Sequence, residues 1–318
     1  MATNQPTTIG TPSPPTPRYP FVVFGPKANC TLDLCPVQMS VYGYRPSLAA
    51  NYAFIACLGL ACAIHLILGV RTRSWWFMGA MCSGCVVCIV GYVGRIMLYY
   101  NPWSFVGFML QIILVGSGPV FFSAAIYVTL SKLITFLDPA ISRIPPQAYI
   151  WIFLLCDVVA LTLQAVGGGL STSTHGQSQL GVDLGLAGLV FQVVTMLAFS
   201  VSLTEYLARY LARSRVRLNA RLKLFLAALA AATILILGRS AYRVEELSKG
   251  YSGPSIRNEP LFIGLEGVVI VVAVFCLCVG HPGLALEGRT LEAEHNPLSF
   301  SDDRSNSMSP EEKAHQSA

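Results

Sequence analysis

Long apolar stretches alternate along this chain with short polar connections. Seven apolar spans follow one another, at roughly 48–70, 75–98, 107–133, 148–170, 181–206, 221–241 and 260–281. A helix of about 20 apolar residues is long enough to cross the hydrocarbon core of a bilayer. The pattern therefore predicts an all-α membrane protein, a bundle of seven transmembrane helices.

The composition supports a membrane location. Of the 318 residues, 54% are hydrophobic and only 12% are charged, and the mean hydropathy is +0.59. A soluble domain carries about 25% charged residues. The net charge of +5 comes from bases in short loops between the spans, so it indicates membrane topology, and no nucleic-acid partner is expected.

Basic residues are unequally divided between the two sets of connections. The connections after the first, third and fifth spans contain Arg71 and Arg73, then Lys132 and Arg143, then Arg209, Arg213, Arg215, Arg217, Arg221 and Lys223. On the opposite side, two loops have no base and the third has Arg239, Arg243, Lys249 and Arg257. Because base-rich short loops face the cytoplasm, we expect the N-terminus outside and the C-terminus in the cytoplasm.

Three regions follow from this map. Residues 1–42 are predicted to be an extracellular or lumenal tail without a visible signal peptide, and residues 43–282 the seven-helix membrane domain. Residues 283–318 are polar, net acidic and without apolar periodicity, which predicts a disordered cytoplasmic tail.

The N-terminal tail carries two features of an oxidising compartment. Asn29-Cys30-Thr31 matches the acceptor sequence for N-glycosylation. Cys30 and Cys35 flank a short loop that a disulfide could close. The alternative is a chance sequon beside two free thiols.

The span from Trp151 to Leu170 contains an acid near its middle, Asp157. An acidic side chain at the centre of a membrane helix costs about 2.5 to 3.5 kcal/mol on insertion scales. Gln164 lies two turns further on the same face, and Gly167 to Gly169 allow close approach of a neighbouring helix. Intramembrane acids mark a pathway or a site, although Asp157 could instead be a structural hydrogen-bonding group between helices.

Other polar side chains lie in the half of the spans that is predicted to be outermost. The candidate substrate path, with Asp157 near the midplane, consists of Tyr92, Arg95, Tyr127, Asp157, Gln164, Gln192, Arg239, Tyr242, Arg243, Glu246 and Glu266. Within this set, Arg239, Tyr242, Arg243 and Glu246 share one helix face, which is either a surface salt-bridge ladder or the rim of a polar mouth. Since buried charges must pair, we expect Arg95 or Arg239 to meet Glu266 or Asp157.

The order and spacing of several motifs resemble the fungal RTA-like family over residues 40–282. The motifs are Tyr44-x-Pro46 with Asn51 and His65; G-Y-x-x-R from Gly91 to Arg95; Gly118-Pro119 to Tyr127; Asp157 with Gln164 and Gly167; Gln192; R-x-x-Y-R-x-x-E from Arg239 to Glu246; Gly250; and Glu259. The chain departs from the usual pattern at Cys88, Ile263 and Glu266, where a glutamate, a tyrosine and an aspartate are usual.

The resemblance implies a seven-span protein that exports or translocates sphingoid long-chain bases, sterol-like compounds or other toxic amphiphiles and confers resistance to them. Its partners would be membrane lipids or amphiphilic small molecules, and its location the plasma membrane, with an internal membrane as the alternative. The rival hypothesis is a seven-span lipid-sensing receptor or regulator without transport activity.

Sequence motifs of enzymes are absent from the chain. It has no G-x-x-x-x-G-K-[ST], no H-E-x-x-H and no G-x-S-x-G, so we expect neither an enzyme nor a cofactor. Cys82, Cys85 and Cys88 have a spacing that suggests a metal site, but no matching His or Cys cluster accompanies them, and no bound metal is expected.

Overall fold

Seven helices among the described residues are long and apolar enough to cross a membrane. The computed structural model describes residues 22–23, 25–173, 179–213, 220–249 and 256–284. The helices are α1 (Leu48–Arg71), α2 (Trp75–Tyr100), α3 (Phe105–Leu110) with α4 (Gly116–Leu137), α5 (Pro146–Ser173), α6 (Gln179–Arg213), α7 (Ala220–Ser248), and α8 (Glu259–Leu261) with α9 (Val269–Val279). The predicted all-α bundle of seven spans is confirmed.

Two of the seven spans are continued through π-helical turns. The turn η2 (Gln111–Val115) joins α3 to α4, and η4 (Phe262–Val268) joins α8 to α9. Short 3₁₀ turns, η1 (Val37–Met39) and η3 (Pro139–Ile141), lie in connections. A π-helical turn inserts one extra residue and is frequent at functional sites, so these two turns direct attention to the part of the bundle where they lie.

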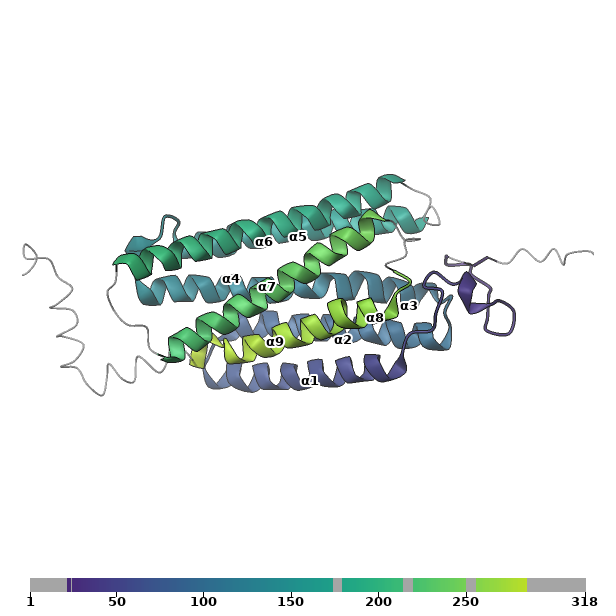
Figure 1. The fold of residues 1–318 in the computed structure, drawn as a ribbon, viewed down its shortest axis with the longest axis horizontal. Coiled ribbons are helices and arrows are strands. Elements are labelled where there is room, and N and C mark those ends of the chain that lie inside the picture. The colour runs from purple at the N-terminus through teal and green to yellow at the C-terminus, as the bar shows by residue number, and fades with distance from the viewer. Residues whose placement is uncertain (1–21, 24, 174–178, 214–219, 250–255, 285–318) are drawn as a thin grey trace, which may run out of the picture.

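Each helix packs on the next in chain order, and α9 closes the ring on α1. In Figure 1, α5 and α6 form one side of the bundle, α1, α2 and α9 form the other, and α4 and α7 lie between them. Helix α4 has 14 buried residues. It is therefore the core helix of the ring, against which α2, α5 and α7 all pack.

Some span boundaries differ from those predicted. The sixth span was expected to end near residue 241 and the fifth near 206, yet α7 continues to Ser248 and α6 to Arg213. The added turns are polar helix held by ion pairs of Arg209 with Glu205 and of Lys249 with Glu245. Hydropathy measures where the apolar stretch ends, and a helix can continue beyond it.

The residues before the first span fold against the end of the bundle. Cys30 and Cys35 form a disulfide that is buried with Trp103, and the backbone N–H of Ser47 donates to Glu259 Oε1 at 2.5 Å. Asn29 is exposed, and its side chain accepts a hydrogen bond from Val22 N–H at 2.9 Å. Residues 1–21 and 285–318, which include all but the first two residues of the predicted disordered tail, lie outside the described residues.

Glycines bring α5 and α6 into close contact. A Cβ atom added to Gly167 would collide with backbone atoms of Gly181 and Gly185, and one added to Gly188 would lie 2.7 Å from the carbonyl oxygen of Ala160. Gly168 and Gly169 have open space at the same position. Of the three glycines that were expected to allow a close approach, Gly167 does so.

We predict that Gly167→Ala lowers the thermal unfolding temperature of the purified protein in detergent, because the methyl group forces α5 away from α6. Gly59→Ala on α1 is the matched control, since nothing lies within 4 Å of its added Cβ. Alanine is favoured over glycine in a helix by about 1 kcal/mol, so the control should be unchanged or more stable. Equal unfolding temperatures for the two variants would contradict the close contact.

Candidate functional site: a buried charge cluster beside a polar pocket

Arg239 of α7 is buried at the centre of the site, with its side chain 1% exposed. Its Nη2 donates to the carbonyl oxygen of Val115 at 2.8 Å, and its Nη1 lies 3.5 Å from that of Gly116. Pro119, four residues after Val115, has no N–H, so the Val115 carbonyl lacks its usual helical donor. The guanidinium group supplies the missing hydrogen bond.

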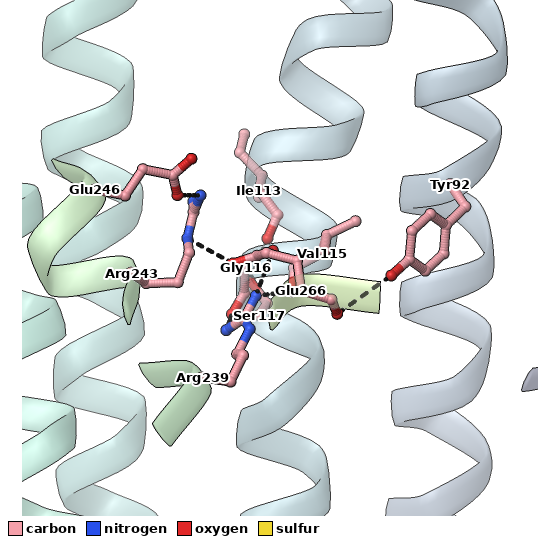
Figure 2. A network of polar contacts seen from close by, with 9 residues as sticks. All are labelled: Tyr92, Ile113, Val115, Gly116, Ser117, Arg239, Arg243, Glu246 and Glu266. Carbon is pink, nitrogen blue, oxygen red and sulfur yellow. Dashed lines mark hydrogen bonds and ion pairs between the residues drawn. The ribbon is translucent and has the colours of Figure 1, made fainter. Parts of the chain in front are cut away.

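Glu266 balances this charge from the second π-helical turn. Its Oε2 accepts from Arg239 Nη2 at 3.1 Å, and its Oε1 lies 3.3 Å from Nε of Arg243. The Tyr92 hydroxyl of α2 donates to the backbone carbonyl of Glu266 at 3.4 Å. Figure 2 shows how these groups converge from α2, η2 to α4, α7 and η4.

Glu246 completes the cluster by pairing with Arg243, three residues before it on α7. Two arginines thus face two glutamates, and the formal charges cancel. A buried pair of this kind is costly to break, because the remaining partner stays as an uncompensated charge. Of the two interpretations of the charged strip, a surface ladder is wrong, since Arg239 and Glu246 are buried.

A pocket of about 200 Å³ lies beside the cluster. Residues of η2, α4, α5, α6 and α7 line it, together with Tyr42, which precedes α1, and Ile256, which precedes α8. The polar lining consists of Tyr42, Gln111, Ser117, Gln164, Arg243 and Glu246. The strip of α7 therefore forms part of the wall of a polar pocket, which is the second of its two interpretations.

Glutamine side chains in and beside the pocket form one hydrogen bond and leave one acceptor without a partner among the described residues. Gln164 Nε2 donates to Gln192 Oε1 at 3.0 Å, so two predicted path residues bond across α5 and α6. Gln111 is 3% exposed, and its Oε1 has no hydrogen-bond partner within the described part of the chain. A buried acceptor without a partner costs about 1–3 kcal/mol, which a ligand donor could recover.

Arg95 lies in a separate polar group near the start of α1. Its guanidinium carbon is 3.7 Å from the centre of the Phe262 ring, and its Nη2 donates to the Tyr44 hydroxyl at 3.2 Å. Nη2 is also 3.8 Å from Glu259 Oε1. Burial raises the pKa of Tyr44 despite the opposing effect of Arg95. Arg95 is therefore not the partner of Glu266, and the expected pairing is made by Arg239.

Asp157 and Tyr127 lie deeper in the bundle, between α5 and α4. The Tyr127 hydroxyl faces the Asp157 carboxyl, but neither carboxylate oxygen has a hydrogen bond of normal geometry to a described residue. Asp157 is 1% exposed. No arginine in the described ranges pairs with it, so of the pairings that were left open, the structure forms the one between Arg239 and Glu266.

Tyr242, the remaining candidate, is half-buried on α7, and its hydroxyl has no hydrogen-bond partner among the described side chains and backbone. Sequence reasoning did not single out Tyr42, Ile256 or the carbonyl groups of Val115 and Gly116. The Val115 carbonyl had a detectable signal, because Pro119 removes its helical donor. Tyr42 and Ile256 come from outside the apolar spans, and no periodicity indicated them.

These features define a multi-pass integral membrane protein with a charged, hydrogen-bonding pocket toward the end of the bundle where α1 begins. The chain belongs to the RTA1-like family, whose model, described as "RTA1 like protein", matches residues 81–289. The family resemblance that the motifs suggested is confirmed.

Curated relatives come from Saccharomyces cerevisiae. A "Sphingoid long-chain base transporter RSB1" of strain Lalvin EC1118 is 30% identical over 305 residues, covering 84% of this chain and 80% of the relative. "Protoporphyrin uptake protein 1" of strain S288c is 27% identical over 201 residues, covering 62% of this chain and 66% of that protein. "Protein RTM1" is 28% identical over 200 residues, covering 62% and 64%. No solved structure matches.

We predict that Arg239→Met lowers the thermal unfolding temperature of the purified protein strongly. The substitution keeps an unbranched side chain as long as the aliphatic part of arginine but removes the guanidinium group, which leaves Glu266 and the Val115 carbonyl without it; breaking a buried pair costs about 3–5 kcal/mol. Arg209→Met is the control, because its pair with Glu205 is partly exposed and such pairs contribute about 0–1 kcal/mol. Similar unfolding temperatures for both variants would show that Arg239 does not stabilise the fold.

Proposed function

We propose that the protein translocates amphiphilic lipids across its membrane, with sphingoid long-chain bases as the leading substrate class. The observation that carries the proposal is the polar pocket, which is lined by Glu246 and by a Gln111 oxygen that has no hydrogen-bond partner among the described residues. The name of the RSB1 relative supports the substrate class. No ATP-binding motif is present in the sequence, so the transport would not be driven by a motor of its own.

The pocket has room for a head group and not for an alkyl chain. Ligand sites for whole drug-sized molecules have volumes of about 300–1,000 Å³, whereas this pocket has about 200 Å³. Ile113, 45% exposed, and Ala165 form part of the lining while facing outward from the bundle. A chain attached to a head group in the pocket would therefore leave between η2 and α5 and remain in the lipid.

The lining suits a head group with an ammonium and hydroxyls. The ammonium would share the Glu246 carboxylate with Arg243, and a hydroxyl would donate to Gln111 Oε1. Both acceptors are buried, where a hydrogen bond to a charged group contributes about 1.5–3 kcal/mol. The four charges of the cluster cancel. The pocket would therefore select its ligand by the positions of its hydrogen-bonding groups and not by a net attraction for cations.

The proposal includes the finer features that the sequence suggests. The pocket would open toward the outer leaflet, with the N-terminus outside, Asn29 glycosylated and the tail after residue 282 in the cytoplasm. In the plasma membrane, this orientation would export toxic amphiphiles and confer resistance. A non-enzymatic role agrees with the transport functions that two of the relatives' names state.

We predict that Glu246→Gln reduces efflux of a labelled long-chain base by about tenfold or more, the equivalent of losing one charge-assisted hydrogen bond. Glu245→Gln is the matched control, because Glu245 is the adjacent residue and faces outward, where it pairs with Lys249. Efflux is measured from cells that hold the variants at equal surface abundance. Gln111→Leu, which keeps the volume but removes the acceptor, should also reduce it.

The same assay separates transport from sensing. A wild-type protein that binds the labelled base without raising efflux would contradict transport and support a receptor. Undiminished efflux in both Glu246→Gln and Gln111→Leu would contradict the pocket as the head-group site while leaving transport established.

A further inference from the structure

Asp157 is a buried acid that the head-group pocket does not use. It is absent from the pocket lining, although Leu161, one helical turn further along α5, lines the pocket. At 1.5 Å per residue, four residues separate the two along the helix by about 6 Å. The carboxyl group thus lies one turn below the floor of the pocket, on the face of α5 that is turned into the bundle.

The surroundings of Asp157 provide no compensating cation. Its two oxygens have no hydrogen bond of normal geometry to any described residue, and no described lysine or arginine forms an ion pair with it. The group that faces the Asp157 carboxyl is the Tyr127 hydroxyl from α4, and near that hydroxyl lie the Ser123 hydroxyl from α4 and the Cys156 thiol from α5. From α6, the contacts of Tyr127 and Ser123 are Phe199 and Met196.

A metal cation does not fit this place. Hard cations need about six or more oxygen ligands at short distance. Around Tyr127 the neighbours are aromatic rings instead, because its ring centroid lies 4.6 Å from that of Phe199 and 5.5 Å from that of Phe153. An ionised carboxylate without a partner in such surroundings is very costly, and a buried acid neutralises instead by binding a proton. Unlike a metal cation, a proton can bind to the carboxylate without additional space and without other coordinating groups.

We propose that Asp157, faced by Tyr127, is a proton-binding site, occupied in this packing, whose proton is the coupling ion for transport. The coupling rests on the function proposed above, whereas the proton site does not. When the helices around the pocket floor separate, the carboxyl group gains access to water in the pocket and releases its proton there. The carboxylate must bind a proton again before the helices repack, because burying an ionised carboxylate without a partner is very costly.

The site is tested by infrared spectroscopy of the purified protein at neutral pH. We expect the carbonyl band of a protonated carboxylic acid, which shifts in D₂O, is lost in Asp157→Asn and changes frequency in Tyr127→Phe. Asp183→Asn is the control and should retain the band, because Asp183 lies near the start of α6 and is exposed. If Asp157→Asn does not fold, an isotope label in the aspartate carboxyl carbons shows whether the wild-type band comes from an aspartate, and Asp157 is the only buried aspartate among the described residues. Absence of the band would overturn the site.

Coupling is tested in vesicles with an imposed pH gradient. We expect the gradient to change the flux of a labelled long-chain base several-fold in the wild type and Asp183→Asn, and not in Asp157→Asn. Flux that ignores the gradient in the wild type would overturn coupling but leave transport established. Absence of any flux would instead contradict the proposed function, and the infrared band would still decide whether Asp157 binds a proton.

Discussion

The structure depends on one buried guanidinium group that repairs a break in a neighbouring helix. Pro119 removes the donor for the Val115 carbonyl in the core helix α4, and Arg239 of α7 supplies it at 2.8 Å. In the hydrocarbon core of a membrane, no water is available to donate a hydrogen bond to a carbonyl that has lost its helical donor. The arginine needs a counter-charge for the same reason, and Glu266 provides it. Three helices are therefore joined through groups that none of them could bury alone.

The pocket is a consequence of this arrangement. The π-helical turns carry Gln111 and Glu266, and the pair made by Arg239 leaves Arg243 and Glu246 to line the adjoining space. Asp157 lies on α5, one turn below the residues of that helix that line the pocket, and no described lysine or arginine pairs with it. The bundle thus separates a hydrogen-bonding cavity, suited to a lipid head group, from a buried acid suited to a proton.

Gly118 packs so closely on Cys88 that a Cβ atom added to Gly118 would collide with the Cys88 thiol. A small side chain at position 88 fits this contact.

Hydrophobic spacing was enough to predict the seven helices, and helical periodicity was enough to place Arg239, Arg243 and Glu246 on one face. The pairing of Arg239 with Glu266 was one of several open choices, because spacing along a chain does not say which helices are neighbours. The hydrogen bond from Arg239 to the Val115 carbonyl was missed, because every residue has a backbone carbonyl and the sequence does not show which of them lack a helical donor. Pro119 was the one indication of this position. Tyr42 and Ile256 could not be predicted, because the segments that carry them reach the pocket only through the tertiary fold.

The central claim is that an amphiphile places its head group in this pocket and its chain in the lipid, and photocrosslinking tests it most directly. A long-chain base with a photoreactive group close to its amine is illuminated with the purified protein, and the labelled peptides are identified. The account predicts labelling within 111–117 and 161–168, which contribute to the lining, and its suppression by excess unlabelled base. Labelling confined to the outward face of α5 around Trp151, which is 72% exposed, or labelling that excess base does not suppress, would contradict it.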